Sequence, residues 1–263
     1  LGDVYKRQVL RDSLAGTRAD SDLLLPCTDL SALWPDAAAR QVTMRYGSTV
    51  RQLDPSDDGI VVNQERFDAA VLAVPPTFAA RLLDAPLRQA GATGLLDALK
   101  AFTYLPIATL NLRLAEPWRL PEPMMMLREE ASRGHVGQWL FDRAQLAGDT
   151  KAGELAVVAS AATSIAERNR HQVIEALIDQ VAEQAARHPA RLPAMPEVSA
   201  AELLIEKRAT FAAVPGLTRP LNSTPWPTLA LAGDWTDTGY PGVLEGAVQS
   251  GLQAARVLNP RAD

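Results

Sequence analysis

The stretch PTLALAGDWTDTGYPGVLEGAVQSGLQAARVL, residues 227–258, decides how this chain is interpreted. An apolar run predicts a strand over 228–232, which ends at Gly233-Asp234 before a polar loop. In open α/β sheets, ligands bind at the carboxyl edge of the strands. The sequence therefore predicts that Asp234 places a carboxylate at a ligand-binding edge. Gly233 is expected to let a ligand or backbone approach closely.

The helix predicted after Pro241-Gly242 carries two rows of small residues spaced four apart. One row is Gly242, Gly246, Ser250 and Ala254, and the other is Ala247, Gly251 and Ala255. Such rows form a flat face that a sheet or a planar ring can approach. Glycine inside a helix costs about 1 kcal/mol relative to alanine, so packing or a ligand must offset it. Tight helix-on-sheet packing without a ligand and ligand binding at the helix N-terminus, where free N–H groups attract negative charge, both stay open here.

Composition excludes several classes of function. The 263 residues carry a net charge of −5 with scattered basic residues, which argues against nucleic-acid binding. Cys27 is the only cysteine, so an intramolecular disulfide and a cysteine-rich zinc site are excluded, and the three histidines lie too far apart to predict a metal site. No run of 18 apolar residues occurs, so no transmembrane helix is predicted. The single cysteine fits a reducing setting, and a cytoplasmic location is expected.

The rest of the chain predicts an α/β fold in two parts. Turn residues over 54–59 predict a hairpin, and FDAAVLAVPP, residues 67–76, predicts a strand covered on both faces, as in a parallel sheet. Ser164 and Glu167 predict a capping box that starts a helix over 164–187. Further helices are expected over 35–45 and 77–83, and further strands over 103–114, 135–143, 154–162 and 200–214.

The predicted domains follow from the change along the chain from a parallel-sheet pattern to a region of long strands and back. Residues 23–84 and 221–263 are expected to form the parallel-sheet domain, and residues 85–220 are expected to form an inserted, strand-rich substrate domain. Residues 1–22 are expected to be an extraneous or partial segment, beginning with the unusual start LGDVYKRQ at residues 1–8.

GDWTDTGYPGVLEGAVQSGLQAA resembles the C-terminal flavin-binding motif of the amine oxidase and phytoene desaturase superfamily. The resemblance implies a Rossmann-like FAD/NAD(P)-binding domain and FAD as the cofactor. It implies that the acid hydrogen-bonds the ribityl or pyrophosphate region and that the helix N-terminus faces the N1–C2=O2 edge of the flavin. STVRQLDPSDDGIVVNQERFDAAVLAVPP resembles the family's hairpin and following strand, in which a valine main chain contacts the adenine. The cofactor-binding residues that the resemblance implies are Val50, Gly233, Asp234, Pro241, Gly242, Val243, Leu244 and Glu245.

Within the superfamily, LLLPCTDLSALWPDAAA, GQWLFDRAQLAG, AVVASAA and EKRATFAAVPGLTRP are similar to segments of the hydroxysqualene dehydroxylases of hopanoid biosynthesis. This resemblance implies reductive dehydroxylation of hydroxysqualene to squalene, an isoprenoid lipid substrate and peripheral contact with the inner face of the membrane. One departure is that no GxGxxG loop is present. We therefore expect the chain to be an N-terminally truncated, C-terminal portion of such an enzyme, and to be inactive and bind FAD weakly or not at all on its own.

A carbocation-like centre in that reaction favours nearby aromatic rings. Trp139, Phe141, Trp235 and Tyr240 are the candidates for substrate contact, with core packing as the alternative. The general acid that assists loss of hydroxide is not identified by the sequence. Its candidates are Asp142, Lys207 and Arg208, with surface or salt-bridge roles as the alternative.

Two other functions stay open from the sequence. One is a carotenoid (phytoene-type) desaturase or a flavin amine oxidase, which runs the opposite redox direction. The other is a non-catalytic fragment that keeps the fold but cannot hold FAD. The sequence gives no indication of the oligomeric state.

Overall fold

The computed structural model describes residues 10–11, 14–149 and 151–259, so the expectation for residues 1–8 lies outside the described residues. Contacts divide the chain into two compact units. Unit 1 comprises residues 1–22, 45–103 and 211–263, and unit 2 comprises residues 23–44 and 104–210. These divisions differ from the expected boundaries at 84 and 220, most of all for residues 23–44, which group with unit 2. The roles assigned to the two domains remain predictions.

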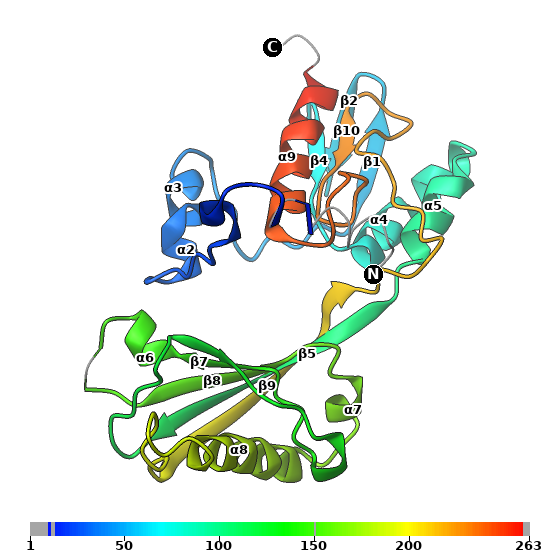
Figure 1. The fold of residues 1–263 in the computed structure, drawn as a ribbon. Coiled ribbons are helices and arrows are strands. Elements are labelled where there is room, and N and C mark those ends of the chain that lie inside the picture. Colours follow the sequence, from blue (N-terminus) through cyan, green and yellow to red (C-terminus); the bar gives the residue numbers. More distant parts are fainter. Residues whose placement is uncertain (1–9, 12–13, 150, 260–263) are drawn as a thin grey trace. The chain divides into compact units, whose positions relative to one another are not determined.

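Unit 1 is built around a parallel strand pair, β4 (Ala70–Leu72) and β10 (Leu229–Leu231), with α9 (Leu244–Leu258) alongside (Figure 1). The register aligns Ala70 with Leu229 and Leu72 with Leu231, so both strands end at the same edge. The three residues of β10 are fully buried. The predicted parallel pairing is confirmed. The expectation that both faces are covered is wrong for Val71, which is 45% exposed.

The remaining elements of unit 1 follow local sequence signals. β1 (Leu53–Ser56) and β2 (Gly59–Val62) form the predicted hairpin, although its turn is shorter than the expected 54–59, and β3 (Glu65–Phe67) adds a third antiparallel strand that the pattern does not predict. The helix expected over 77–83 is longer: α4 (Pro76–Gln89) continues through Pro86 because Leu83 and Leu87 are fully buried. The unit is completed by η1 (Arg18–Ser21) and α5 (Thr93–Lys100).

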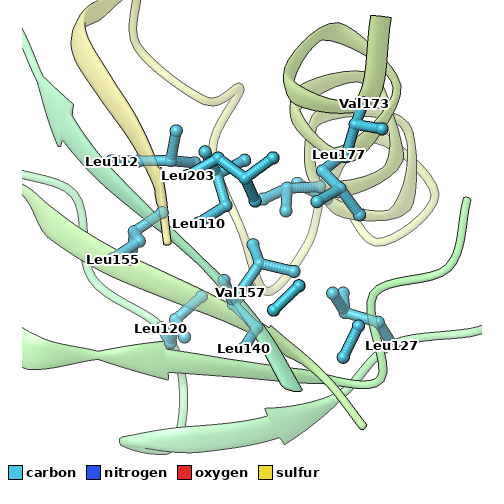
Figure 2. Close-up of a cluster of buried hydrophobic side chains, with 14 of the residues drawn as sticks. Leu110, Leu112, Leu120, Leu127, Leu140, Leu155, Val157, Val173, Leu177 and Leu203 are labelled. Atoms are coloured by element: carbon cyan, nitrogen blue, oxygen red, sulfur yellow. The ribbon is translucent and has the colours of Figure 1, made fainter. Parts of the chain in front are cut away.

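Unit 2 is a five-stranded sheet in the order β6-β7-β8-β5-β9, with the long helix α8 (Arg170–Ala186) along one face (Figure 1). Its strands are β5 (Tyr104–Leu114), β6 (Met124–Met126), β7 (Trp139–Asp142), β8 (Glu154–Ala159) and β9 (Val198–Phe211). Figure 2 shows Val173 and Leu177 of α8 directed at the buried leucines of the sheet. The short helical elements are α2 (Leu30–Leu33), α3 (Pro35–Ala39), η2 (Ala131–Arg133), α6 (Arg143–Leu146) and α7 (Thr163–Ala166).

Two helix predictions in unit 2 are wrong in their bounds. The helix expected over 164–187 is split into α7 and α8, and the capping box of Ser164 and Glu167 does not form. Instead, the Asn169 side chain caps α8 by accepting hydrogen bonds from the backbone N–H groups of His171 (2.9 Å) and Gln172 (3.3 Å). The helix expected over 35–45 ends at Ala39.

Candidate functional site

The candidate site lies where β10 ends in unit 1. Because β4 and β10 are parallel, Ala73 and Ala232 leave the sheet at the same edge, and Asp234 follows soon after Ala232. The Asp234 carboxyl is partly exposed, and burial raises its pKa above the ordinary value, opposed in part by the positive charge of Arg219. No other residue in the described part of unit 1 donates a hydrogen bond to this carboxylate. Asp234 is therefore an acid with hydrogen-bonding capacity to offer a ligand.

Gly242 lies against this carboxylate. A Cβ at position 242 would lie 3.2 Å from Asp234 Oδ2 and 2.8 Å from Phe211 Cε1. The absence of a side chain lets the chain that leads into α9 approach the strand end. The small residue at position 242 is thus explained by close packing around Asp234.

A buried hydrogen-bond network joins the end of β10 to the middle of α9. Ser250 Oγ accepts hydrogen bonds from the Gly233 backbone N–H (2.9 Å) and from Asn222 Nδ2 (2.9 Å), and it lies 2.6 Å from Thr236 Oγ1. Asn222 Nδ2 also donates to the Leu231 carbonyl oxygen (2.7 Å). The sequence marks Ser250 only as a small residue and gives no signal for Asn222 or Thr236, because their shared partner Ser250 lies 28 and 14 residues away.

The two rows of small residues on α9 have different surroundings. Gly246, Ser250 and Ala254 are buried, with Ala254 packed against Ala230 and Ala232 at the end of β10. This row serves helix-on-sheet packing. In the second row, Gly251 and Ala255 are exposed, and no atom lies within 4 Å of a Cβ built at Gly251.

The start of α9 is later than the sequence predicts. The helix begins at Leu244, with Val243 as its N-cap, so Pro241 and Gly242 precede it. No side chain caps this end among the described residues, and Glu245 lies in the first turn. Uncapped N–H groups at a helix N-terminus attract negatively charged or hydrogen-bond-accepting groups. The five predicted residues from Pro241 to Glu245 thus form the entry to α9 and its first turn.

Gly233 lies against a buried indole ring. Its φ is +150°, and a Cβ at this position would lie 2.6 Å from Trp235 Cδ1. The Trp235 side chain is 3% exposed and packs edge-on against Phe102, with ring centroids 6.3 Å apart. The indole ring fills the space on the Cβ side of Gly233, and the predicted contact of this residue with the cofactor remains a prediction. In this arrangement Trp235 acts as a core residue, which is the alternative to substrate contact.

Arg219 is a buried cation that the sequence does not single out. It is 8% exposed, and its guanidinium donates hydrogen bonds to the backbone carbonyls of Asp234 (2.5 Å) and Tyr240. Tyr240 itself is partly exposed. The only sequence signal for Arg219 is its place in EKRATFAAVPGLTRP, one of the segments that carry the resemblance.

Val50 lies elsewhere in unit 1, in an extended segment before the hairpin. The Asn63 side chain bonds the backbone on either side of Val50, accepting from Arg51 N (2.8 Å) and donating to Thr49 O (2.8 Å). Within the described chain, the N–H and carbonyl of Val50 make no hydrogen bond. This arrangement fits the predicted main-chain contact with an adenine, which remains a prediction. A cavity of about 360 Å³ is lined by Thr49, Val50, Arg51, Arg81 and Leu82.

The aromatic candidates of unit 2 lie on the sheet face opposite α8. Trp139 and Phe141 are partly buried and alternate with Leu140, which faces the core. Phe141 lines a cavity of about 630 Å³. The walls of this cavity include Thr109, Ala156, Val158 and residues 25–31.

The three candidates for the catalytic acid do not share a site in the structure. Asp142 is completely buried and caps α6, because its Oδ1 accepts a hydrogen bond from Gln145 N (2.8 Å). Lys207 and Arg208 are exposed on β9. Within the described residues, no group of three or more His, Cys, Asp or Glu side chains is arranged to hold a metal ion.

Asp234 gives the ligand-free chain a distinctive pH dependence. A folded-state pKa raised above its ordinary value of 3.8 means that folding favours the protonated form. The stability that Asp234 contributes is present below about pH 3.8 and is lost as the pH rises through the folded pKa. We expect Asp234→Asn to raise the free energy of unfolding at pH 7 and to have little effect below pH 3.8.

Urea unfolding at several pH values measures this effect. Asp237→Asn is the control, because Asp237 lies in the same loop and is exposed. A stability gain for Asp234→Asn that is the same at every pH would contradict the assignment.

Comparisons with known proteins place these features in a family. The family model for flavin containing amine oxidoreductase matches residues 30–259. Hydroxysqualene dehydroxylase from Rhodopseudomonas palustris is 31% identical over 267 residues, which cover 95% of this chain and 56% of that protein. Hydroxysqualene dehydroxylase from Sinorhizobium fredii is 31% identical over 209 residues, which cover 78% of this chain and 42% of that protein. The chain thus spans about half the length of the curated relatives it matches.

The solved structure of cyclohexylamine oxidase from Brevibacterium oxydans IH-35A has the same fold, with a TM-score of 0.55 and 14% identity. The similarity covers 81% of this chain and 48% of that one. The predicted α/β fold and the predicted resemblance are both confirmed. In the described part of the chain, no helix combines the length and the apolar character needed to cross a membrane. The chain belongs to the flavin containing amine oxidoreductase family.

Proposed function

We propose that this chain provides the flavin-holding strand end and the substrate sheet of an FAD-dependent oxidoreductase that converts hydroxysqualene to squalene. The observation that carries the proposal is the Asp234 carboxylate at the carboxyl edge of the β4–β10 pair. It is partly buried, receives no hydrogen bond from another described residue and has a raised pKa. A partly buried carboxylate without hydrogen-bond donors is stabilised by a ligand whose hydroxyl groups donate hydrogen bonds to it.

The residues present fit an FAD cofactor. Asp234 is suited to accept hydrogen bonds from the hydroxyls of a ribityl chain or a ribose, because an ionised carboxylate offers only acceptors. The start of α9 at Leu244 carries no side-chain cap, so its free N–H groups are suited to the electron-rich edge of a flavin. A bound FAD, once reduced by an external reductant, would supply the two electrons with which hydrogen replaces an allylic hydroxyl that leaves as water.

The sheet of unit 2 fits an apolar chain. The cavity beside Phe141 has about 630 Å³ of space and is lined by Ala156, Val158 and Leu146 among other residues. Pockets of about 300–1,000 Å³ with mostly apolar walls are typical of small-molecule sites. We propose that this cavity receives part of the isoprenoid chain along Phe141, Leu146, Ala156 and Val158, while Asp29 and Arg143 line a polar part of the same cavity.

The proposal includes peripheral contact with the cytoplasmic face of the membrane, because a long hydrocarbon substrate partitions into bilayers. Co-sedimentation with liposomes tests this part. Recovery of all the protein in the supernatant would contradict the proposed membrane contact.

The activity is tested with the protein that contains this chain, FAD, a reductant and hydroxysqualene. We expect squalene as the product, identified by mass spectrometry. Asp234→Ala is expected to lose bound flavin absorbance while keeping its circular dichroism spectrum, because the ligand loses its carboxylate acceptor. The control Asp237→Ala, in the same loop but exposed, should keep its flavin. Desaturation of phytoene, or peroxide formed from an amine, would identify one of the alternative enzymes instead.

A further inference from the structure

The loop that follows β10, residues 234–240, is bonded at both of its ends to the Arg219 side chain. Nη2 of Arg219 donates to the Asp234 carbonyl oxygen (2.5 Å), and Nε donates to the Trp235 carbonyl oxygen (3.4 Å). Nη1 donates to the Tyr240 carbonyl oxygen. One side chain thus engages the first two residues of the loop and its last residue.

A buried cation is unfavourable unless hydrogen bonds replace its hydration. Arg219 is 8% exposed, and its guanidinium lies over the Phe211 ring, 5.5 Å from the ring centroid. A planar guanidinium has donors in a fixed fork that can reach several carbonyls at once, whereas an ammonium group is a compact point charge. The geometry therefore requires arginine and would not be reproduced by lysine.

The same charge acts on the carboxyl of the candidate site. Burial raises the pKa of Asp234, and the positive charge of Arg219 opposes this by lowering it. Arg219 thus affects both the conformation of the 234–240 loop and the ionisation of Asp234. It also ties the start of the loop to Tyr240, which directly precedes the Pro241-Gly242 entry to α9.

We infer that Arg219 is a positioning residue: it holds the 234–240 loop in one conformation and brings a positive charge within electrostatic reach of the Asp234 carboxylate. Its bearing on flavin binding rests on the proposed function, whereas its effect on the loop does not. No contact between Arg219 and a ligand is required.

Hydrogen exchange and NMR titration of the whole chain test the inference. In Arg219→Gln and Arg219→Lys, we expect the amides of residues 234–240 to exchange at least about tenfold faster, as for loss of one hydrogen bond to a charged group. The Asp234 carboxyl should titrate at higher pH in Arg219→Gln, and Arg219→Lys should restore that titration without restoring slow exchange. Arg256→Gln, an exposed change on α9, is the control and should alter neither.

Unchanged exchange and titration in a folded Arg219→Gln variant would overturn the inference. If that variant does not fold, Arg219→Lys decides: slow exchange like that of the wild type would overturn it. Flavin binding is measured separately in the protein that contains this chain. Equal FAD affinity in the wild type and Arg219→Lys would remove the link to the flavin site, whereas absence of FAD binding in the wild type would contradict the proposed function and leave the loop result standing.

Discussion

Replacing Asp142 with alanine is expected to lower the free energy of unfolding of unit 2 by about 3 kcal/mol. The side chain is completely buried, and its two oxygens accept hydrogen bonds from Gln145 N (2.8 Å) and Leu120 N (3.1 Å). Arg119 Nη1 lies 3.7 Å from Oδ1. Alanine would remove the cap of α6 and leave the buried Leu120 N–H without its acceptor.

Urea unfolding followed by circular dichroism measures this loss. Asp149→Ala is the matched control, because Asp149 Oδ1 accepts hydrogen bonds from Lys151 N (2.8 Å) and Ala152 N (3.2 Å) but is exposed. That change should cost less than about 1 kcal/mol. Asp142→Ala is also measured for turnover in the protein that contains this chain. If this variant keeps wild-type stability but loses turnover, the result would contradict the structural role and support Asp142 as the catalytic acid.

Asp142 shows what a single sequence cannot provide. Its place in GQWLFDR suggests chemistry, but its role depends on the Leu120 N–H, 22 residues away, and on the start of α6 immediately after it. Burial of a carboxylate follows from tertiary packing, which has no local sequence signal. The same limit applies to Arg219 and Asn222, whose partners lie in other segments.

Local sequence patterns predict the secondary structure better than they predict the partners of buried polar residues. The apolar run 228–232 contains β10, and two of the expected turn residues, Asp57 and Asp58, connect the strands of the hairpin. The small residues Gly246, Ser250 and Ala254 lie within α9, where Ala254 packs against the end of β10. Predictions are wrong where two local signals compete, as at Ser164 and Asn169, where the asparagine caps the helix. For the site, the pattern locates Asp234 and Gly242 but misses the residues that hold the loop around them.

Gly233→Ala separates the two explanations for the glycine at the end of β10. If the glycine left room for a ligand, alanine would weaken ligand binding and leave the ligand-free chain unchanged. The structure predicts instead that alanine destabilises the ligand-free chain. The added Cβ would lie 2.6 Å from Trp235 Cδ1, and φ at this position is +150°. Backbone strain and overpacking together should lower the free energy of unfolding by about 3 kcal/mol without any ligand.

Gly251→Ala is the matched control for this change. Gly251 lies within α9, where nothing lies within 4 Å of an added Cβ, so alanine should stabilise the chain by up to about 1 kcal/mol. Both variants are measured by urea unfolding without flavin. If Gly233→Ala is as stable as the wild type, the packing explanation is wrong. A close-packed core leaves no room for a methyl group beside the indole, so the added Cβ must displace the indole or the loop at a cost in stability.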